Sequence, residues 1–429
     1  MSTHRLTRWL SQRNDTVFAL YAMGAAFSCY FCMYAFRKPY TAIGYGSYPE
    51  IWGVDYKIAL LLAQLVGYTL SKFIGIRVIA ELPAHKRPFA LLFLIVIAEL
   101  SLVAFAITPD QYGPIFLLIN GLPLGMIWGL VFGFLEGRKL TEVLGAGLSA
   151  SYIIASGFVK SAGRTLIDSG ISEKWMPAMT GLCFLLPFFL CVYLLYRLPP
   201  PSEEDIALRT QRAPMNAQAR WAFLKSCTLG LVLLTSLYVF LTAYRDFRDN
   251  FAAEIWQALG YGKAPAIFTY SELPVAFGVL LTLALLVRIK DNFRAMVIVH
   301  QIMLGGCVLI GVSTLAFEWN YISGASWMIL VGLGAYLAYV PYGSMLFDRL
   351  IAAIGFVGTA GFMIYVTDAF GYVGSIGINL YKNFGQKTLT WDQFFIQLSY
   401  FTSLVCATCF LASMLYFKSL SSKNTPLTD

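Results

Sequence analysis

Residues 199–220 read PPPSEEDIALRTQRAPMNAQAR, and they are the only long polar segment of the 429-residue chain. Apolar stretches of about 20 residues follow one another on both sides of it, and a helix of this length crosses a hydrocarbon core ~30 Å thick. The breaks between these stretches predict helices near residues 16–40, 57–79, 88–107, 114–136, 144–167, 176–197, 224–248, 265–288, 295–316, 324–347, 353–379 and 391–417. We therefore expect an all-α membrane protein with twelve transmembrane helices in two six-helix bundles.

The composition also indicates lipid surroundings. Hydrophobic residues make up 58% of the chain and charged residues 13%, against roughly 25% charged residues in soluble globular proteins. The net charge of +8 does not predict a nucleic-acid partner, because the Lys and Arg residues lie in short loops and not along one face. Most of these Lys and Arg residues lie in the loops and tails of one side of the predicted membrane, which predicts cytoplasmic termini.

The same pattern predicts the organisation of the chain. Arg5, Arg8 and Arg13 precede an apolar run that has no small-residue cleavage site, so an uncleaved tail is expected. We predict a monomer in the inner (plasma) membrane of a bacterium. Its expected parts are a cytoplasmic tail at 1–15, a six-helix half at 16–197, a cytoplasmic linker at 198–223, a second six-helix half at 224–417 and a tail at 418–429.

Cysteine and motif patterns do not favour redox, metal or enzyme chemistry. Nearly all eight cysteines lie in apolar stretches, including the pairs Cys29-x-x-Cys32 and Cys406-x-x-Cys409, where thiols usually act as small buried hydrophobes. The sequence has no nucleophile with an attendant base, no Gly-rich phosphate loop and no His/Cys metal spacing. We expect no cofactor, no metal and no enzymatic activity.

Basic residues within the predicted spans are the main functional signal. A cation at the centre of a spanning helix costs ~2.5–3.5 kcal/mol on insertion scales, so each one indicates a functional site. After the loops are set aside, the remaining basic residues are Arg37, Lys38, Lys72, Lys160, Arg164, Arg245 and Arg248.

The first helix places its arginine beside two tyrosines. Tyr30, Tyr34 and Arg37 are four and three residues apart, which puts them on one face of a helix. The second helix repeats the pairing with Tyr68 and Lys72. A guanidinium offers a planar fork of donors and a phenol adds neutral ones, so the pattern predicts binding of an oxyanion.

A structural explanation of these cations remains open at this point. They could extend to the outer interface, or pair with Asp246, Asp249, Glu272 or Asp368 for stability alone. This alternative applies most to Lys38 and Arg248, which lie near helix ends.

Two six-helix halves around a linker resemble the layout of the major facilitator superfamily, and the motifs resemble its organophosphate:phosphate antiporters. In that family the first helix carries Tyr-x-x-x-Tyr-x-x-Arg-Lys, which is present here at residues 30–38. The family's second-helix Tyr-x-x-x-Lys-Phe matches residues 68–73, and its seventh-helix arginine after Val-Phe matches Arg245. Glu272, within Tyr-Ser-Glu, fits its eighth helix.

The sequence also departs from this family. Its fifth-helix histidine is missing, and we place His4, His85 and His300 outside the membrane cores. The fifth helix instead carries Lys160 and Arg164, and Asp368 is an additional carboxylate. These differences indicate a divergent branch.

The resemblance implies exchange of a small, phosphorylated organic anion for inorganic phosphate by alternating access. Arg37 and Arg245 would share the anion, with Lys72, Lys38 and the tyrosines as further contacts. Coupling or gating would fall to Glu272, Asp368, Lys160 and Arg164. Two alternatives stay open: proton-coupled symport of an organic anion, with Asp368 or Glu272 as proton carrier, and a membrane-embedded ligand sensor on a transporter scaffold.

Overall fold

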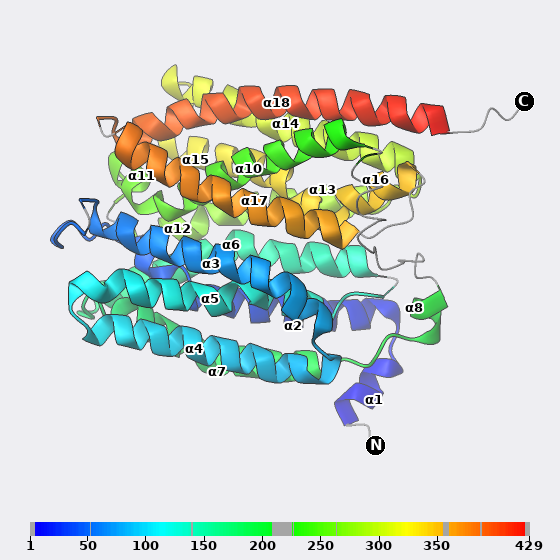
Figure 1. The fold of residues 1–429 in the computed structure, drawn as a ribbon, viewed down its shortest axis with the longest axis horizontal. Helices are drawn as coiled ribbons and strands as arrows, with labels where there is room; N and C mark the ends of the chain where they lie inside the picture. Colours follow the sequence, from blue (N-terminus) through cyan, green and yellow to red (C-terminus); the bar gives the residue numbers. More distant parts are fainter. Residues whose placement is uncertain are drawn as a thin grey trace, which may run out of the picture. The chain divides into compact units, whose positions relative to one another are not determined.

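The computed structural model describes residues 5–51, 53–138, 140–207, 225, 227–262, 264–354, 360–386 and 388–424 (Figure 1). In this part of the chain the secondary structure is helical, apart from an isolated bridge between Ile51 and Val54. Residues 208–223 of the predicted linker lie outside the described residues. The long helices are α2 (Asp15–Met33), α3 (Tyr56–Glu81), α4 (Arg87–Ile107), α5 (Gly113–Phe132), α6 (Thr141–Asp168), α7 (Met176–Tyr196), α10 (Thr228–Asn250), α13 (Glu272–Leu286), α14 (Asn292–Glu318), α15 (Gly324–Pro341), α17 (Ala360–Leu380) and α18 (Trp391–Asn424).

The predicted helices correspond to these elements. Within the described residues, eleven helical stretches are long and apolar enough to cross a membrane, and α17 is the further long helix expected near 353–379. Shorter elements join them: α1 (Arg5–Ser11), α8 (Glu203–Ala207), α11 (Ala252–Ala258), α12 (Ile267–Tyr270) and α16 (Phe347–Ala353). The predicted all-α membrane fold is therefore confirmed.

Local sequence signals set several helix starts. Asn14 caps α2 by accepting a hydrogen bond from the Val17 amide, and Asp55 caps α3 by accepting one from the Lys57 amide. A proline lies in the first turn of α4, α5 and α7. Proline is favoured there because the first N–H groups of a helix have no partner within the helix, so its lack of an N–H costs no hydrogen bond.

Two predicted helix ends were wrong. The first predicted helix extended to residue 40, whereas α2 ends at Met33 and continues as the 3₁₀ turns η1 (Tyr34–Phe36) and η2 (Pro39–Ala42). Pro39 cannot donate a helical hydrogen bond and disfavours helix before it. The tenth span was expected to end at 347, but a π-helical turn at Tyr342–Leu346 continues it into α16.

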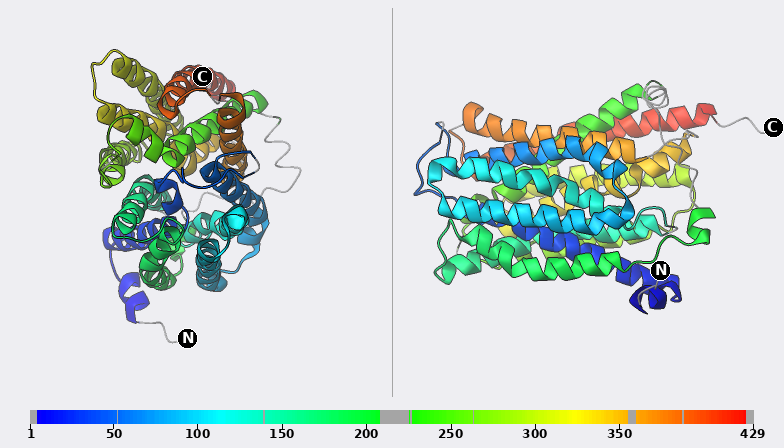
Figure 2. Two further views of the ribbon diagram at one scale, coloured as in Figure 1. Left: turned by 90° about the vertical axis from the view of Figure 1, so that its left-hand side faces the viewer. Right: turned by 60° about the horizontal axis from the view of Figure 1, so that its bottom comes forward.

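The chain forms two compact units. Unit 1 comprises Met1–Leu208, Arg248–Leu273 and Asn379–Asp392, and unit 2 comprises Arg209–Phe247, Pro274–Ile378 and Gln393–Asp429. In unit 1, α5 packs against α3 and α4, and α2 packs against α6 and α7 (Figure 2). In unit 2, α14 packs against α15 and α16.

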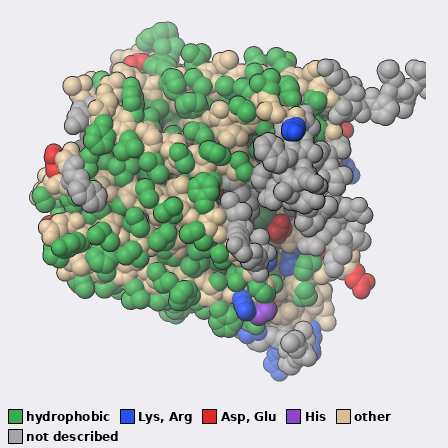
Figure 3. All heavy atoms as spheres, in the orientation of Figure 1, with side chains coloured by type: hydrophobic (Ala, Val, Ile, Leu, Met, Phe, Trp, Pro, Cys, Tyr) green, Lys and Arg blue, Asp and Glu red, His purple; other side chains and the backbone are tan. Residues whose placement is uncertain are grey.

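Large apolar side chains are exposed along the helices. Leu186 is 77% exposed, Leu404 72% and Phe89 69%. Hydrophobic side chains are spread over the described part of the face drawn in Figure 3. Apolar exposure of this extent is unfavourable in water but not in a bilayer.

Glycines bring α3 and α5 into backbone contact. A Cβ at Gly121 of α5 would collide with the Gln64 carbonyl of α3 and stand 2.9 Å from the Tyr68 amide. A Cβ at Gly67 would meet the Leu118 carbonyl in the same way. Because both obstacles are backbone atoms, side-chain rotation cannot relieve them.

Gly121→Ala is therefore expected to lower the free energy of unfolding by about 1–3 kcal/mol, the usual range for overpacking. Unfolding of the detergent-purified protein, followed by tryptophan fluorescence, measures this change. Gly24→Ala on α2 is the matched control, since nothing lies within 4 Å of its added Cβ. Equal stability of the two variants would contradict the backbone contact.

Candidate functional site

Five residues predicted from spacing lie together in unit 1. We call Arg37, Tyr30, Tyr34, Tyr68 and Lys72 the Arg37 cluster. The Arg37 side chain is buried, with its Cζ 3.8 Å from the ring centroid of Tyr68 and 5.9 Å from that of Tyr34. Lys72 Nζ lies 5.3 Å from the Tyr68 centroid, and the rings of Tyr30 and Tyr34 meet edge to face at 5.6 Å.

The cluster combines two cations with three phenols. Tyr68 contacts both cations through its ring, which stabilises the positive charges by cation–π attraction. Stacking uses the face of the guanidinium, whereas its N–H donors point outward in its plane. The same arginine can therefore stack on Tyr68 and donate to an oxyanion.

A polar network that the sequence analysis missed holds the backbone of Arg37. Because α2 ends at Met33, the carbonyls of Phe36 and Arg37 need partners outside a helix. Gln64 Nε2 donates to the Arg37 carbonyl at 3.0 Å, and Asn120 Nδ2 donates to the Phe36 carbonyl at 3.1 Å. Gln64 also donates to Asn120 Oδ1 and accepts from the Tyr40 hydroxyl. Single amides within apolar stretches are the sequence signal that could have identified this network.

Lys38 does not join the Arg37 cluster. Its Nζ lies 2.5 Å from Asp249 Oδ2 and donates to Asn250 Oδ1 at 2.7 Å. Lys160 Nζ lies 2.6 Å from the other oxygen, Asp249 Oδ1, which also accepts a hydrogen bond from Ser156. One carboxylate thus holds two buried lysines, and we call Lys38, Lys160, Ser156 and Asp249 the Asp249 cluster.

Further ion pairs in unit 1 involve the remaining predicted charges. Glu272 Oε1 lies 2.8 Å from Arg248 Nη1, so Glu272 forms an ion pair with Arg248. Arg164 forms a longer pair with Asp168, at 3.5 Å, and both side chains are more than one-third exposed.

Lys57 is a buried cation that the sequence analysis did not single out. It lies in the first turn of α3, is 1% exposed and pairs with Glu254 at 2.5 Å. Its partner is almost two hundred residues further along the chain, which is why local sequence could not indicate the burial.

In unit 2, Arg245 lies against both a ring and a carboxylate. Its Cζ is 4.0 Å from the Tyr339 centroid, and its Nη2 is 2.7 Å from Asp246 Oδ1. Tyr238 donates to the Tyr339 hydroxyl at 2.6 Å and lies 3.1 Å from Asp368 Oδ1. Arg245 is therefore balanced by a carboxylate, and Asp368 belongs to the same polar cluster.

His300 was also placed wrongly by sequence. It is fully buried in α14, within a membrane-spanning stretch. Its two ring nitrogens lie 2.8 Å from the Met296 carbonyl and 3.3 Å from the Ser413 hydroxyl. His300 belongs to α14 of unit 2, so it is not a fifth-helix histidine.

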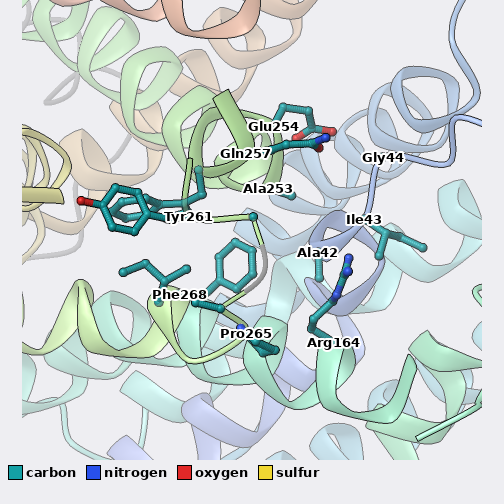
Figure 4. A pocket seen from close by; sticks show the side chains of 14 residues that line it. Ala42, Ile43, Gly44, Arg164, Ala253, Glu254, Gln257, Tyr261, Pro265 and Phe268 are labelled. Carbon is teal, nitrogen blue, oxygen red and sulfur yellow. The ribbon is translucent and has the colours of Figure 1, made fainter. Parts of the chain in front are cut away.

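A cavity of about 70 Å³ in unit 1 lies beside Arg164 rather than Arg37. Figure 4 shows Arg164 extending from α6 toward Ala42 and Ile43, with Glu254 and Gln257 on another part of the wall. Glu254 already pairs with Lys57, and the other lining residues carry no charge. This cavity offers one cation, so the Arg37 cluster remains the better anion site.

Comparisons with known proteins identify the fold and a family. The profile of a family described as "Family of unknown function (DUF5690)" matches residues 39–420. The comparison with curated proteins gave no match.

Solved structures match the chain almost from end to end. A D-xylose-proton symporter (TM-score 0.58, 14% identity) is matched over 96% of this chain and 99% of that chain. A variant of the nucleoside transporter NupG (TM-score 0.58, 15% identity) is matched over 92% and 99%. A bacterial homologue of the human drug peptide transporters PepT1 and PepT2 (TM-score 0.61, 12% identity) is matched over 95% and 100%. At these identities the likeness establishes the fold, which is the major facilitator fold.

Proposed function

The chain belongs to the DUF5690 family, and we propose that it is a membrane transporter that carries a small anionic solute by alternating access. The transporter assignment is supported by the fold, since the similar structures are sugar, nucleoside and peptide transporters. The anionic solute is supported by one observation above all: Arg37 and Lys72 lie buried around a single tyrosine ring.

A phosphate group is the anion that best suits this arrangement. A guanidinium fork binds two oxygens of one phosphate, and a nearby ammonium can neutralise a second negative charge. We therefore propose a phosphorylated organic solute that exchanges for inorganic phosphate.

The inner-membrane location, the cytoplasmic termini and the monomeric state belong to this proposal. The part of Arg245 in binding the anion stays a prediction, because Asp246 already balances its charge.

The ion pairs of unit 1 suit a gating function. Asp249 and Glu272 follow the linker in sequence, whereas Lys38 and Lys160 precede it. A pair of this kind can stabilise one state of a transporter and open in the other. We assign gating to the Asp249 cluster. A gating part for Glu272, whose partner Arg248 also follows the linker, stays a prediction.

Proton-coupled symport of an organic anion is the second candidate. It is favoured by the composition of the unit 2 cluster, where Asp246 and Asp368 accompany one arginine. A carboxylate in a membrane-spanning helix can carry a proton across the membrane.

Counterflow in proteoliposomes tests both candidates. Vesicles loaded with phosphate receive labelled phosphate outside, together with sugar phosphates, glycerophosphates, phosphonates or carboxylates as competitors. Exchange predicts tracer uptake that needs internal phosphate, whereas symport predicts uptake driven by an imposed pH gradient into empty vesicles. Ligand binding without either flux would contradict transport and favour a sensor.

A further inference from the structure

Glu99 is a buried acid that the proposed function does not use. It lies in α4 and is the only charged residue between Arg87 and the end of that helix at Ile107. Its side chain is 5% exposed, and neither carboxyl oxygen has a hydrogen-bond partner among the described residues. A carboxyl group in this position calls for a chemical explanation.

The surroundings of Glu99 are apolar. The carboxyl group packs against Gly181 of α7, where a Cβ would collide with Oε2, and that Cβ would also lie 3.1 Å from the Phe36 ring. No Asp, Glu, Lys, Arg or His occurs in α5 or α7. Three elements packed against α4 carry or adjoin titratable groups. The turn η1 contains Tyr34 and is followed by Arg37, and the 3₁₀ turn η3 (Ala84–Lys86) contains His85 and Lys86. The titratable groups of α7 are Cys183, Cys191, Tyr193 and Tyr196.

Energetics favour the neutral acid in this conformation. An ionised carboxylate buried without a partner costs several kcal/mol, and such a group neutralises by holding a proton. None of the surrounding titratable groups forms an ion pair with Glu99 in the described part of the chain. The structure thus places a carboxylic acid inside the six-helix packing of unit 1.

One amide connects this acid to the anion site. Asn120 Nδ2 donates to the carbonyl of Ala98, next to Glu99, at 3.0 Å. The same nitrogen donates to the carbonyl of Phe36, next to Arg37, at 3.1 Å. A change at Glu99 can therefore move the turn that carries Arg37.

We propose that Glu99 is a proton-binding site coupled to the anion at the Arg37 cluster. The carboxyl group takes up a proton from water on one side of the membrane and releases it to water on the other side, alternating between the acid and the carboxylate. The proton accompanies the anion in the same direction. This inference rests on the proton-coupled form of the proposed transport function, in which the anion enters without an exchanged phosphate, and not on the identity of the organic solute.

The test uses the full chain in proteoliposomes that contain a pH-sensitive dye. Counterflow of labelled phosphate in phosphate-loaded vesicles without a gradient reports transport. Acidification of the lumen, when phosphate is added to vesicles that contain none, reports proton movement. Glu99→Gln imitates the neutral acid, so we expect counterflow to persist while acidification and pH-driven accumulation are lost. Glu50→Gln, an exposed carboxyl, is the matched control and should behave as wild type.

Different outcomes separate the two proposals. Absence of counterflow in the wild type overturns the transport function, whereas wild-type counterflow without acidification overturns the role of Glu99 alone. Acidification by Glu99→Gln at the wild-type rate overturns it as well. If Glu99→Gln does not yield folded protein, Glu99→Asp retains a titratable group and is expected to keep acidification. Counterflow by Glu99→Asp without acidification contradicts the proposal.

Discussion

Arg37→Lys is expected to reduce phosphate counterflow by about 100-fold, which corresponds to roughly 3 kcal/mol, the value of a strong hydrogen bond to a charged group. Lysine keeps the charge, but it has neither the planar fork for two oxygens nor a flat face to stack on Tyr68. Initial rates of tracer uptake into phosphate-loaded proteoliposomes measure the effect.

Two controls make this result specific. Arg8→Lys, at an exposed position in α1, should leave counterflow unchanged. The unfolding midpoint of Arg37→Lys should remain close to that of the wild type, because Gln64 and Asn120 hold this turn by its backbone and not by the guanidinium. Counterflow at the wild-type rate would remove Arg37 from the anion site.

Helical periodicity was sufficient to predict two pairs of neighbours within the Arg37 cluster. Tyr30 and Tyr34 are one turn apart, as are Tyr68 and Lys72, so each pair shares a helix face whatever the tertiary structure. The exact end of α2 was not predictable in the same way, because the apolar pattern continues past Met33 to Phe36. Pro39 was the only local signal of the break.

Residues whose partners are distant in sequence were beyond this reasoning. The burial of Lys57 depends on Glu254. For Lys38, the sequence analysis gave Asp249 as one of four candidate carboxylates, and the tertiary structure selects it. The sequence analysis considered only cations in the apolar spans. For that reason it overlooked the uncharged Gln64 and Asn120 and the acidic Glu99. A search for every polar side chain in those spans would have found them.

Asp249→Asn is expected to destabilise the protein by about 3–5 kcal/mol, the usual result of removing one partner from a buried ion pair. The substitution removes the carboxylate that lies 2.5 Å from Lys38 and 2.6 Å from Lys160, whose side chains are 5% and 2% exposed. Denaturant unfolding of the detergent-purified protein measures the loss. Asp168→Asn, which breaks the exposed pair with Arg164, is the control and should change stability by less than about 1 kcal/mol.

A triple variant distinguishes a structural part of the Asp249 cluster from a gating part. Asp249→Asn combined with Lys38→Met and Lys160→Met removes every charge of the cluster, and replacement of a whole buried ion pair by apolar groups is often neutral for stability. We expect this variant to regain most of the lost stability. If the cluster also acts as a gate, the triple variant will still differ from the wild type in its counterflow rate, because the ion pairs that stabilise one transport state are absent. If the triple variant recovers its stability and also transports at the wild-type rate, the cluster has a structural role and no gating role. If its stability does not recover, the argument that buried unpaired lysines destabilise Asp249→Asn is contradicted.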